Sequence, residues 1–286
     1  MGTWERGLHS PGGGVMLPLF GLAVLGLGAL ALGASSASPS EASWVARVLA
    51  VVSGSEGGYS SVNPNTDGAG LSFGLLQWTQ ASGNLGKLLG AMQQDDAPAF
   101  ARGFGTPHAE LLRQTRSTDQ TVRLAPVGGV LLWREPWLSR FRSAGAHPTF
   151  RLTQDRLALE GEHMRAALEL AWGLGGPTER SVALLFDTAV QQGPNAAKRI
   201  ASQVVQALQA EGYTTVSSAE LLSRYAAQAA APYRRRSPPE SSRYTWKRAS
   251  DGSYHAWVGS VDLYADITRR RQAILTHPEL GDTLLA

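Results

Sequence analysis

The chain has 286 residues, of which 43% are hydrophobic and 17% are charged, so it can form a packed core in one large domain or two small ones. It contains no cysteine, which excludes disulfides, thiol nucleophiles, cysteine metal sites and an acylated cysteine anchor. Its histidines have no zinc-binding spacing. Its net charge of +3 suits an anionic partner such as a cell wall, a membrane surface or nucleic acid, or has no functional meaning.

The N-terminal segment is apolar and contains no charged residue between Arg6 and Glu41. The twenty residues Val15–Ala34 are long enough to cross a bilayer, and the small residues of Ser35–Ala37 suit signal peptidase. We therefore expect residues 1–38 to be a cleaved signal peptide, which we favour, or a retained membrane anchor. In both cases the rest of the chain is expected to be secreted or periplasmic.

The pattern after this segment is mainly helical. Apolar residues recur at three- and four-residue spacing over Trp44–Val52, which gives one apolar helix face. This spacing predicts a helix that begins near Pro39, with Ser40 as its N-cap, and ends near Gly54.

Turn-forming residues are dense over Gly57–Phe73, which predicts a short irregular hairpin before helical periodicity resumes near Leu75. The Pro-, Arg- and Ser-rich stretch Pro232–Ser242 is expected to be a surface loop, because too few residues follow it to form a separate core. We expect residues 39–286 to form a single domain. Eight later segments are predicted to be helical, and Gly, Pro or Asn bounds the fifth and sixth of them: Asn84–Met92, Pro107–Arg116, Val130–Arg142, Thr149–Trp172, Glu179–Gln191, Asn195–Glu211, Ser218–Ala229 and Asp262–Leu275.

Two carboxylates accompany the predicted hairpin. Glu56 follows the first apolar helix, and Asp67 lies eleven residues later in a glycine-rich turn. Glycoside hydrolysis requires such a pair, because one acid protonates the leaving oxygen while the other carboxylate attacks or activates water. A Glu packed against helix residues has a raised pKa, whereas an Asp on a polar loop stays ionised. The spacing alone is common, and by itself it is explained better by a helix end followed by an Asp-Gly turn.

The segment from Glu56 to Gln77 resembles the active-site segment of the lysozyme superfamily, in which a helix, a catalytic Glu, a β-hairpin and a second helix follow one another. The motif Asp-x-x-Gly-x-Ser-x-Gly, which starts at Asp67, is similar to the Asp-x-x-Gly-x-Thr/Ser pattern of family 46 chitosanases. The resemblance implies that Glu56 is the acid, that Asp67 is the base and that Ser72 positions the attacking water. It favours inversion of configuration.

The order of these residues also resembles phage-type lysozymes. The stretch Ser72–Gln77 is similar to the Gly-Leu-Met-Gln element of goose-type lysozymes and lytic transglycosylases, which often work with a single Glu. If the resemblance to goose-type lysozymes and lytic transglycosylases is the relevant one, Asp67 is not expected to be catalytic. We predict that Tyr59, Gln77 and Trp78 contact the substrate, with Trp78 stacking on a sugar ring or packing in the core.

The stretch Leu185–Gly193 resembles the long central helix of the same superfamily, where a buried Asp pairs with an Arg near the catalytic Glu. Asp187 takes that position, and the run Arg269–Arg271 is a candidate source of its partner, because an inward-facing Asp requires one. An Asp187 that points to solvent is the alternative. The other tryptophans that could stack on sugars or pack internally are Trp133, Trp137, Trp246 and Trp257.

Together these patterns predict a mainly α, lysozyme-like helical domain with a small β-hairpin beside the active-site cleft. The expected function is that of a monomeric glycosidase that cleaves β-1,4 links of peptidoglycan, with no metal, no cofactor and no nucleic-acid partner. A chitosanase, a lytic transglycosylase and a non-catalytic cell-wall-binding protein remain alternatives. The basic net charge argues mildly against chitosan, which is cationic.

Overall fold

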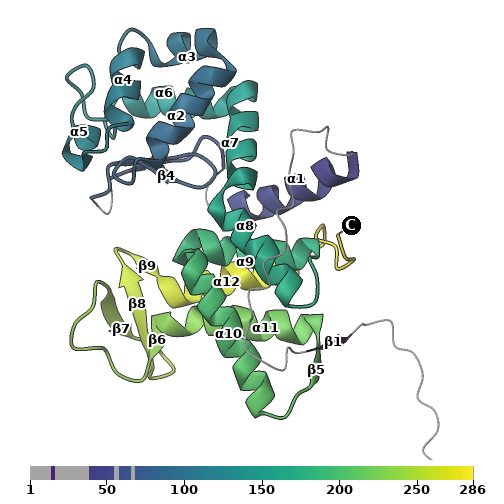
Figure 1. Cartoon of the computed structure of the whole chain (residues 1–286). Helices are drawn as coiled ribbons and strands as arrows, with labels where there is room; N and C mark the ends of the chain where they lie inside the picture. Colours follow the sequence, from purple (N-terminus) through teal and green to yellow (C-terminus); the bar gives the residue numbers. More distant parts are fainter. Residues whose placement is uncertain (1–13, 17–38, 55–57, 66–67, 286) are drawn as a thin grey trace, which may run out of the picture. The chain divides into compact units, whose positions relative to one another are not determined.

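The computed structural model describes residues 14–16, 39–54, 58–65 and 68–285 (Figure 1). Within these residues it contains twelve α-helices and three small antiparallel sheets, which confirms the predicted mainly helical fold with a small β-element. The chain divides into two compact units, which we call the hairpin unit (Ser38–Arg165) and the C-terminal unit (Ala166–Ala286 together with Met1–Ala37). That residues 39–286 act as one catalytic domain stays a prediction.

The hairpin unit combines a three-stranded antiparallel sheet with mostly short helices, coloured purple to teal in Figure 1. Helix α8 (Glu162–Gly173) crosses the boundary between the two units. The other elements of the hairpin unit, in chain order, are α1 (Pro39–Gly54), β2 (Val62–Pro64), β3 (Leu71–Phe73), β4 (Trp78–Thr79), α2 (Asn84–Asp95), α3 (Ala97–Phe104), α4 (His108–Thr115), α5 (Gln120–Leu124), α6 (Trp137–Ala146) and α7 (Pro148–Glu160).

Helix α1 has the apolar face that its sequence predicts. Val48, Leu49 and Val52 on this face are buried, and the helix ends at Gly54 as expected. It begins at Pro39, so Ser40 lies inside the first turn and is not the N-cap. Proline is favoured at the first helical position because its missing N–H would have no intrahelical partner there.

Aromatic side chains dominate the core of the hairpin unit. Phe73 of β3 packs against Phe141 of α6 with ring centroids 5.1 Å apart, and Phe104 of α3 contacts the same ring at 5.2 Å. Tilted ring pairs of this kind are favourable beyond the area they bury. Helix α6 also approaches the chain before β2 closely, since a Cβ on Gly145 would lie 2.3 Å from the carbonyl oxygen of Tyr59. This approach requires glycine at position 145.

The periodicity predicted that the chain returns to helix near Leu75, but the structure has no helix there. Gly74 and Gln77 have positive φ angles of 81° and 51°, so the backbone turns and Trp78–Thr79 add a third strand, β4, to the hairpin. The next helix, α2, begins at Asn84. Strand pairing with β3 therefore outweighs the local helical pattern of these residues.

Two further predicted helices have different bounds. The helix predicted from Val130 begins only at Trp137, because Val130 pairs with Val127 in an isolated β-bridge. The helix predicted over residues 149–172 is two helices, α7 and α8, separated at Gly161, whose extended backbone ends α7.

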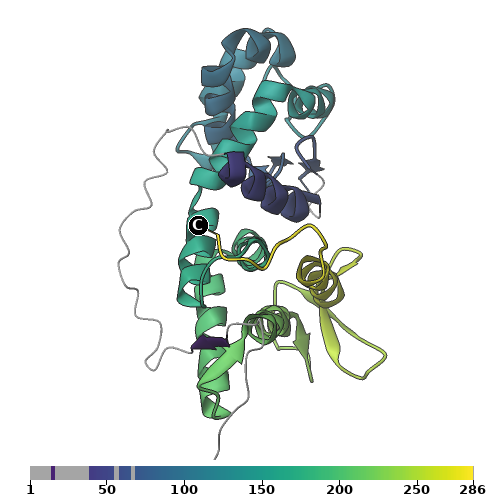
Figure 2. The same ribbon diagram turned by 90° about the vertical axis from the view of Figure 1, so that its right-hand side faces the viewer.

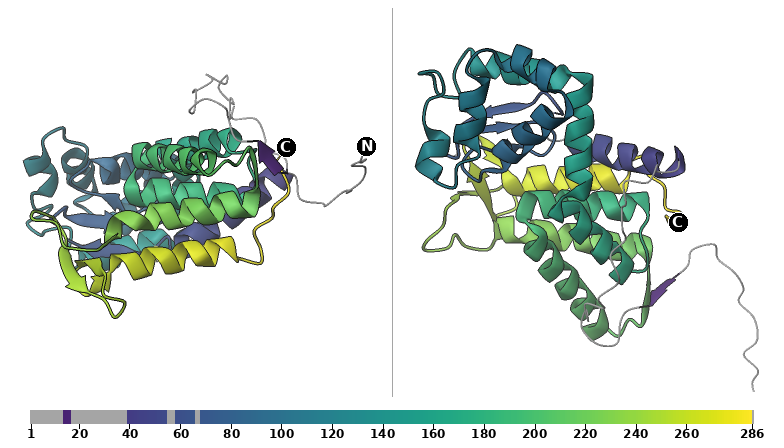
Figure 3. Two further views of the ribbon diagram at one scale, coloured as in Figure 1. Left: turned by 90° about the horizontal axis from the view of Figure 1, so that it is seen from below. Right: turned by 45° about the horizontal axis from the view of Figure 1, so that its top comes forward.

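The C-terminal unit is built around helices α9 to α12, which lie side by side (Figure 3, left). The four helices predicted for this unit agree with the structure to within one residue at each end. In chain order the elements are α9 (Glu179–Gln192), α10 (Pro194–Ala210), β5 (Thr215–Ser217), α11 (Ser218–Ala230), the 3-10 turn η1 (Ala231–Tyr233), β6 (Arg234–Arg235), β7 (Thr245–Arg248), β8 (Tyr254–Val258), β9 (Val261–Asp262) and α12 (Leu263–Leu275).

Residues 14–16 form strand β1, which pairs antiparallel with β5 and is seen as the purple strand beside a green one in Figure 2. These three residues belong to the predicted signal peptide or anchor, and the other residues of 1–38 lie outside the described part of the chain. No helix among the described residues is long and apolar enough to cross a membrane. Export and membrane anchoring stay predictions.

The stretch Pro232–Ser242 was expected to be a surface loop, but it contains strand β6. Strand β6 pairs with β8, β8 pairs with β7, and β9 joins the other end of β8, which gives a four-stranded antiparallel sheet. Only Ala256 among the residues of these strands is buried. The sheet lacks the alternating apolar pattern that identifies a half-buried strand, so the sequence does not indicate it.

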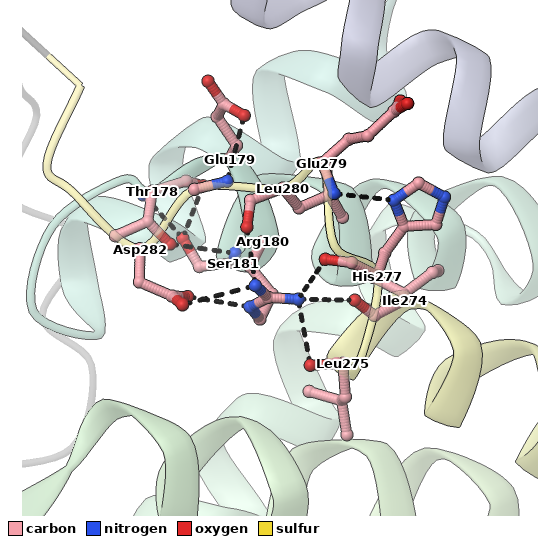
Figure 4. A network of polar contacts seen from close by, with 11 residues as sticks. Thr178, Glu179, Arg180, Ser181, Ile274, Leu275, His277, Glu279, Leu280 and Asp282 are labelled. Atoms are coloured by element: carbon pink, nitrogen blue, oxygen red, sulfur yellow. Dashed lines mark hydrogen bonds and ion pairs between the residues drawn. The ribbon is translucent and has the colours of Figure 1, made fainter.

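Arg180, in the first turn of α9, binds the end of α12 and the segment that follows it (Figure 4). Its guanidinium donates hydrogen bonds to the carbonyl oxygens of Ile274, Leu275 and His277 at 2.9–3.1 Å, and to that of Leu280. Two of these carbonyls belong to the last turn of α12, where the helix dipole favours a cation. The α12 carboxyl end therefore depends on one arginine that is distant in sequence.

Candidate functional site

The two predicted catalytic carboxylates, Glu56 and Asp67, lie outside the described residues. The segments next to them in the chain are described: residues 58–65 lead into and through β2, and residues 68–73 lead into and through β3. The candidate site is therefore built from this hairpin and from the side chains that hold it. All of them belong to the hairpin unit.

Strand register separates the hairpin into two faces. Asn63 of β2, Ser72 of β3 and Thr79 of β4 are direct partners across the sheet, so they share one face. Their neighbours Val62, Phe73 and Trp78 share the opposite face, where they pack into the hydrophobic core. Ser72, predicted to position water, thus belongs to the polar face of the sheet. It is 6% exposed.

Trp78 lies on the core side of the sheet. It is partly buried against the core that contains Phe73, so packing accounts for its position. Its predicted stacking on a sugar ring stays a prediction. Trp137 is 1% exposed and donates a hydrogen bond to the carbonyl of Val127, so this tryptophan is a core residue and not a sugar platform.

Tyr59 is tied to a residue that the sequence did not single out. Its hydroxyl donates a 2.7 Å hydrogen bond to Asp155 of α7, and the Arg151 guanidinium lies over its ring at 5.6 Å. Burial raises the pKa of the Tyr59 hydroxyl, and the hydrogen bond to Asp155 raises it further. Burial also raises the pKa of the Asp155 carboxyl, while the bond from Tyr59 partly offsets that rise. An acid with a raised pKa therefore lies beside the hairpin.

Gln154, the neighbour of Asp155, joins the two ends of the hairpin. Its Oε1 accepts a 2.8 Å hydrogen bond from the N–H of Leu75, and its Nε2 donates to the carbonyl of Tyr59 at 3.2 Å. A Cβ on Gly74 would lie 2.4 Å from the same Oε1, and Gly74 has a φ of 81°, so this turn requires glycine. Gln77 completes the turn by donating to the Gly74 carbonyl at 3.0 Å.

A sequence signal for Gln154 does exist. Phe150, Gln154 and Ala158 are spaced by four residues on α7, and all three are buried. A glutamine on the apolar face of a helix requires hydrogen-bond partners there, because its amide would otherwise be desolvated without compensation. The pattern marks an inward-facing polar residue, but it does not identify the hairpin as the partner.

Replacing Gln154 with leucine is expected to lower the free energy of unfolding by about 2–3 kcal/mol, because the Leu75 N–H and the Tyr59 carbonyl lose their partner in the interior. Urea unfolding followed by circular dichroism measures the change. The control is Gln206→Leu at an exposed position of α10, which should change stability by less than about 0.5 kcal/mol. Equal effects of the two substitutions would contradict the bracing role of Gln154.

The raised pKa of Asp155 predicts a pH dependence of stability. Between the ordinary Asp value of 3.8 and the raised folded-state value, the folded protein binds more protons at this site than the unfolded protein does. By linkage, this site makes stability fall as pH rises through that window. The free energy of unfolding of Asp155→Asn, relative to the wild type, should therefore increase as pH rises from 3.8. Urea titrations at several pH values test this, and parallel curves for the two proteins would contradict it.

In the C-terminal unit, Asp187 is 1% exposed and is paired as its sequence predicts. Its Oδ1 accepts a 2.5 Å hydrogen bond from Arg270, and its Oδ2 lies 3.9 Å from Nε of Arg271. Burial lowers the pKa of the Arg271 guanidinium, and the charge of Asp187 opposes this shift. The ion pair between Asp187 and the arginine run is thus present, and a solvent-facing Asp187 is excluded. Its role beside a catalytic Glu stays a prediction.

Among the described residues, no group of three or more His, Asp or Glu side chains could hold a metal ion. The groups available at the hairpin are a polar sheet face with a serine, and an adjacent carboxyl that accepts one hydrogen bond from a phenol.

The described residues form a mainly helical, lysozyme-like fold, and comparison with solved structures finds proteins with a similar fold. The structure is similar to a family 46 chitosanase of Gynuella sunshinyii solved with chitotetraose, with a TM-score of 0.50 and 16% identity over 81% of this chain and 86% of that chain. Two structures of a chitosanase from Bacillus subtilis MY002, one native and one a mutant complexed with 6 GlcN, have TM-scores of 0.45 and 14% identity over 66% of this chain and 76% of theirs. No protein-family model and no curated protein matches the chain. The first likeness defines the fold and not the function.

Proposed function

We propose that the chain is a glycoside hydrolase that cleaves β-1,4 links in an amino-sugar polymer, with peptidoglycan as the first candidate substrate. The observation that carries the proposal is a lysozyme-like fold whose small sheet follows Glu56 in the chain and has Asp67 between its strands β2 and β3. A fold of this kind with a Glu and an Asp at these chain positions provides the two carboxylates that glycosidases require.

In this proposal Glu56 is the general acid, and its proton passes to the glycosidic oxygen as the bond between that oxygen and the anomeric carbon breaks. Asp67 accepts a proton from the water that attacks the anomeric carbon from the opposite side, so the configuration inverts. The Ser72 hydroxyl holds this water, which its place on the polar sheet face beside Asn63 and Thr79 supports.

Chitosan is the second candidate substrate, because the similar solved structures are those of chitosanases. Chitosan is a cationic polymer, and a chain with a net charge of +3 is less suited to bind it than to bind an anionic or neutral glycan. The charge therefore favours peptidoglycan, and the structural likeness favours chitosan.

Parallel assays of reducing-end release from purified peptidoglycan and from chitosan test the proposal. Glu56→Gln should abolish release, because the amide cannot protonate the leaving oxygen, and Asp67→Asn should greatly reduce it. Glu240→Gln, an exposed substitution of the same type, should retain full activity. Full activity of Glu56→Gln on both polymers would end the assignment, and cleavage of chitosan alone would make the second candidate the function.

Product analysis distinguishes the mechanisms. An inverted anomeric configuration in the first product, seen by NMR, is expected for the acid and base roles of Glu56 and Asp67. A retained configuration contradicts inversion, and an anhydro product indicates a lytic transglycosylase. Binding to cell walls without cleavage by the wild type would identify a non-catalytic wall-binding protein.

Export belongs to the same proposal, because the polymer lies outside the cytoplasm. N-terminal sequencing of the protein from the producing cells should locate a cleavage site near Ala37, or it should show an intact N-terminus in the membrane fraction. An intact protein confined to the cytoplasm would contradict export.

A further inference from the structure

A groove with a volume of about 430 Å³ opens in the hairpin unit, between α2 and the helices α4, α5 and α7 labelled in Figure 1. Four cationic side chains line it, and none of its lining residues is acidic. The cations are Lys87 of α2, Arg116 at the end of α4, Arg123 of α5 and Arg156 of α7. Volumes of this order accommodate small organic ligands.

Glycines form much of the α2 side of the groove, so few side chains project into it there. Gly86 and Gly90 line it with four-residue spacing, which keeps them on one face of α2, and Gly83 lines it just before the helix begins. Gly86 has a packing reason, because a Cβ there would lie 2.2 Å from the carbonyl oxygen of Thr115. Gly90 has none, because the nearest atoms to its Cβ would be those of Arg116 at an ordinary 3.8 Å. Glycine weakens a helix interior relative to alanine, so packing does not account for it at position 90.

Two of the four cations are already engaged. Arg123 donates hydrogen bonds to the carbonyl oxygens of Ala81, Ser117 and Thr118, and Arg156 forms a 2.8 Å ion pair with Asp95. The side chains of Lys87 and Arg116 have no hydrogen bond or ion pair with any other described residue, and both residues are exposed. The groove therefore presents to solvent two cations that no described carboxylate pairs with, and the field that they create attracts anions.

We propose that this groove binds a phosphate-bearing small ligand of about the size of a sugar phosphate, with Lys87 and Arg116 contacting the phosphate. A phosphate monoester carries a charge of about −1.5 to −2 at neutral pH, which matches two free cations, whereas a carboxylate carries one charge. A guanidinium and an ammonium are the side-chain groups that bind phosphate oxygens best. The site uses neither of the proposed catalytic carboxylates, so it stands apart from the glycosidase proposal.

Calorimetric titration of the full-length protein at low salt tests the site with three probes: inorganic phosphate, glucose 6-phosphate and glucuronate. Glucose 6-phosphate should bind most tightly, because it uses both the charge and the volume of the groove. The double variant Lys87→Gln/Arg116→Gln should weaken its binding by about tenfold or more. Arg113→Gln removes an exposed cation from α4 that does not line the groove, and it should change the affinity less than twofold, within about 0.4 kcal/mol.

Gly90→Ala provides a second test that does not remove charge. The added methyl fits at 3.8 Å from Arg116 and favours the helix, so the protein should be at least as stable as the wild type while glucose 6-phosphate binds more weakly. Absence of binding by all three probes, equal affinity of the double variant and the wild type, or equal affinity for glucuronate and glucose 6-phosphate would overturn the proposal.

Discussion

Asp187→Asn is expected to lower the free energy of unfolding by about 3–5 kcal/mol, which is the cost of leaving buried charges without their partner. Arg270 is 9% exposed and Arg271 is 1% exposed. The Asp187 carboxylate accepts a hydrogen bond from Arg270, and its Oδ2 lies 3.9 Å from Nε of Arg271. The Arg271 nitrogens have no hydrogen-bond partner within the described residues, so the carboxylate charge is their main compensation. Urea unfolding at neutral pH measures the loss.

The matched control for this substitution is an exposed aspartate of α12, the helix that carries Arg270 and Arg271. Asp266→Asn removes the carboxylate of an ion pair with Arg269, whose side chain is 77% exposed. Water solvates that arginine when its partner is lost, so the change should be below about 1 kcal/mol. A loss at Asp187 no larger than the loss at Asp266 would show that the buried charges are compensated by other groups.

Arg180→Lys should lower the free energy of unfolding by about 3 kcal/mol, although it conserves the positive charge. The guanidinium donates to four carbonyl oxygens of residues 274–280, and its side chain is only 15% exposed. A lysine ammonium is a single point of donation and cannot reach these acceptors together, so several carbonyls would be left unpaired. The segment after α12 should then separate from α9.

Hydrogen exchange over residues 276–285 tests the local part of this effect, and thermal unfolding tests the global part. Asp282→Asn removes only the carboxylate that Arg180 contacts at 2.8 Å, and this carboxylate is 69% exposed, so it should cost less than about 1 kcal/mol. If residues 276–285 exchange their amide hydrogens as slowly in Arg180→Lys as in the wild type, the hydrogen bonds to the carbonyl oxygens do not hold this segment in place.

Local sequence patterns determined much of the helical architecture. The apolar spacing of α1 and the helical pattern of α9 to α12, with Gly, Pro and Asn bounding α9 and α10, predicted those helices to within one or two residues, because helix periodicity and capping act over a few neighbouring positions. The inward-facing Asp187 and its arginine partners were also predictable, because a carboxylate among apolar residues requires a nearby cation.

Contacts between distant residues decided the rest. Strand β4 exists because Trp78 and Thr79 pair with β3, and the turn before it is held by Gln154, which is 79 residues from Leu75 in sequence. The sheet of β6 to β9 likewise depends on pairing across loops and not on a local pattern. Strand pairing and buried polar contacts are set by which segments meet in space, and that information is not contained in the periodicity of any one segment.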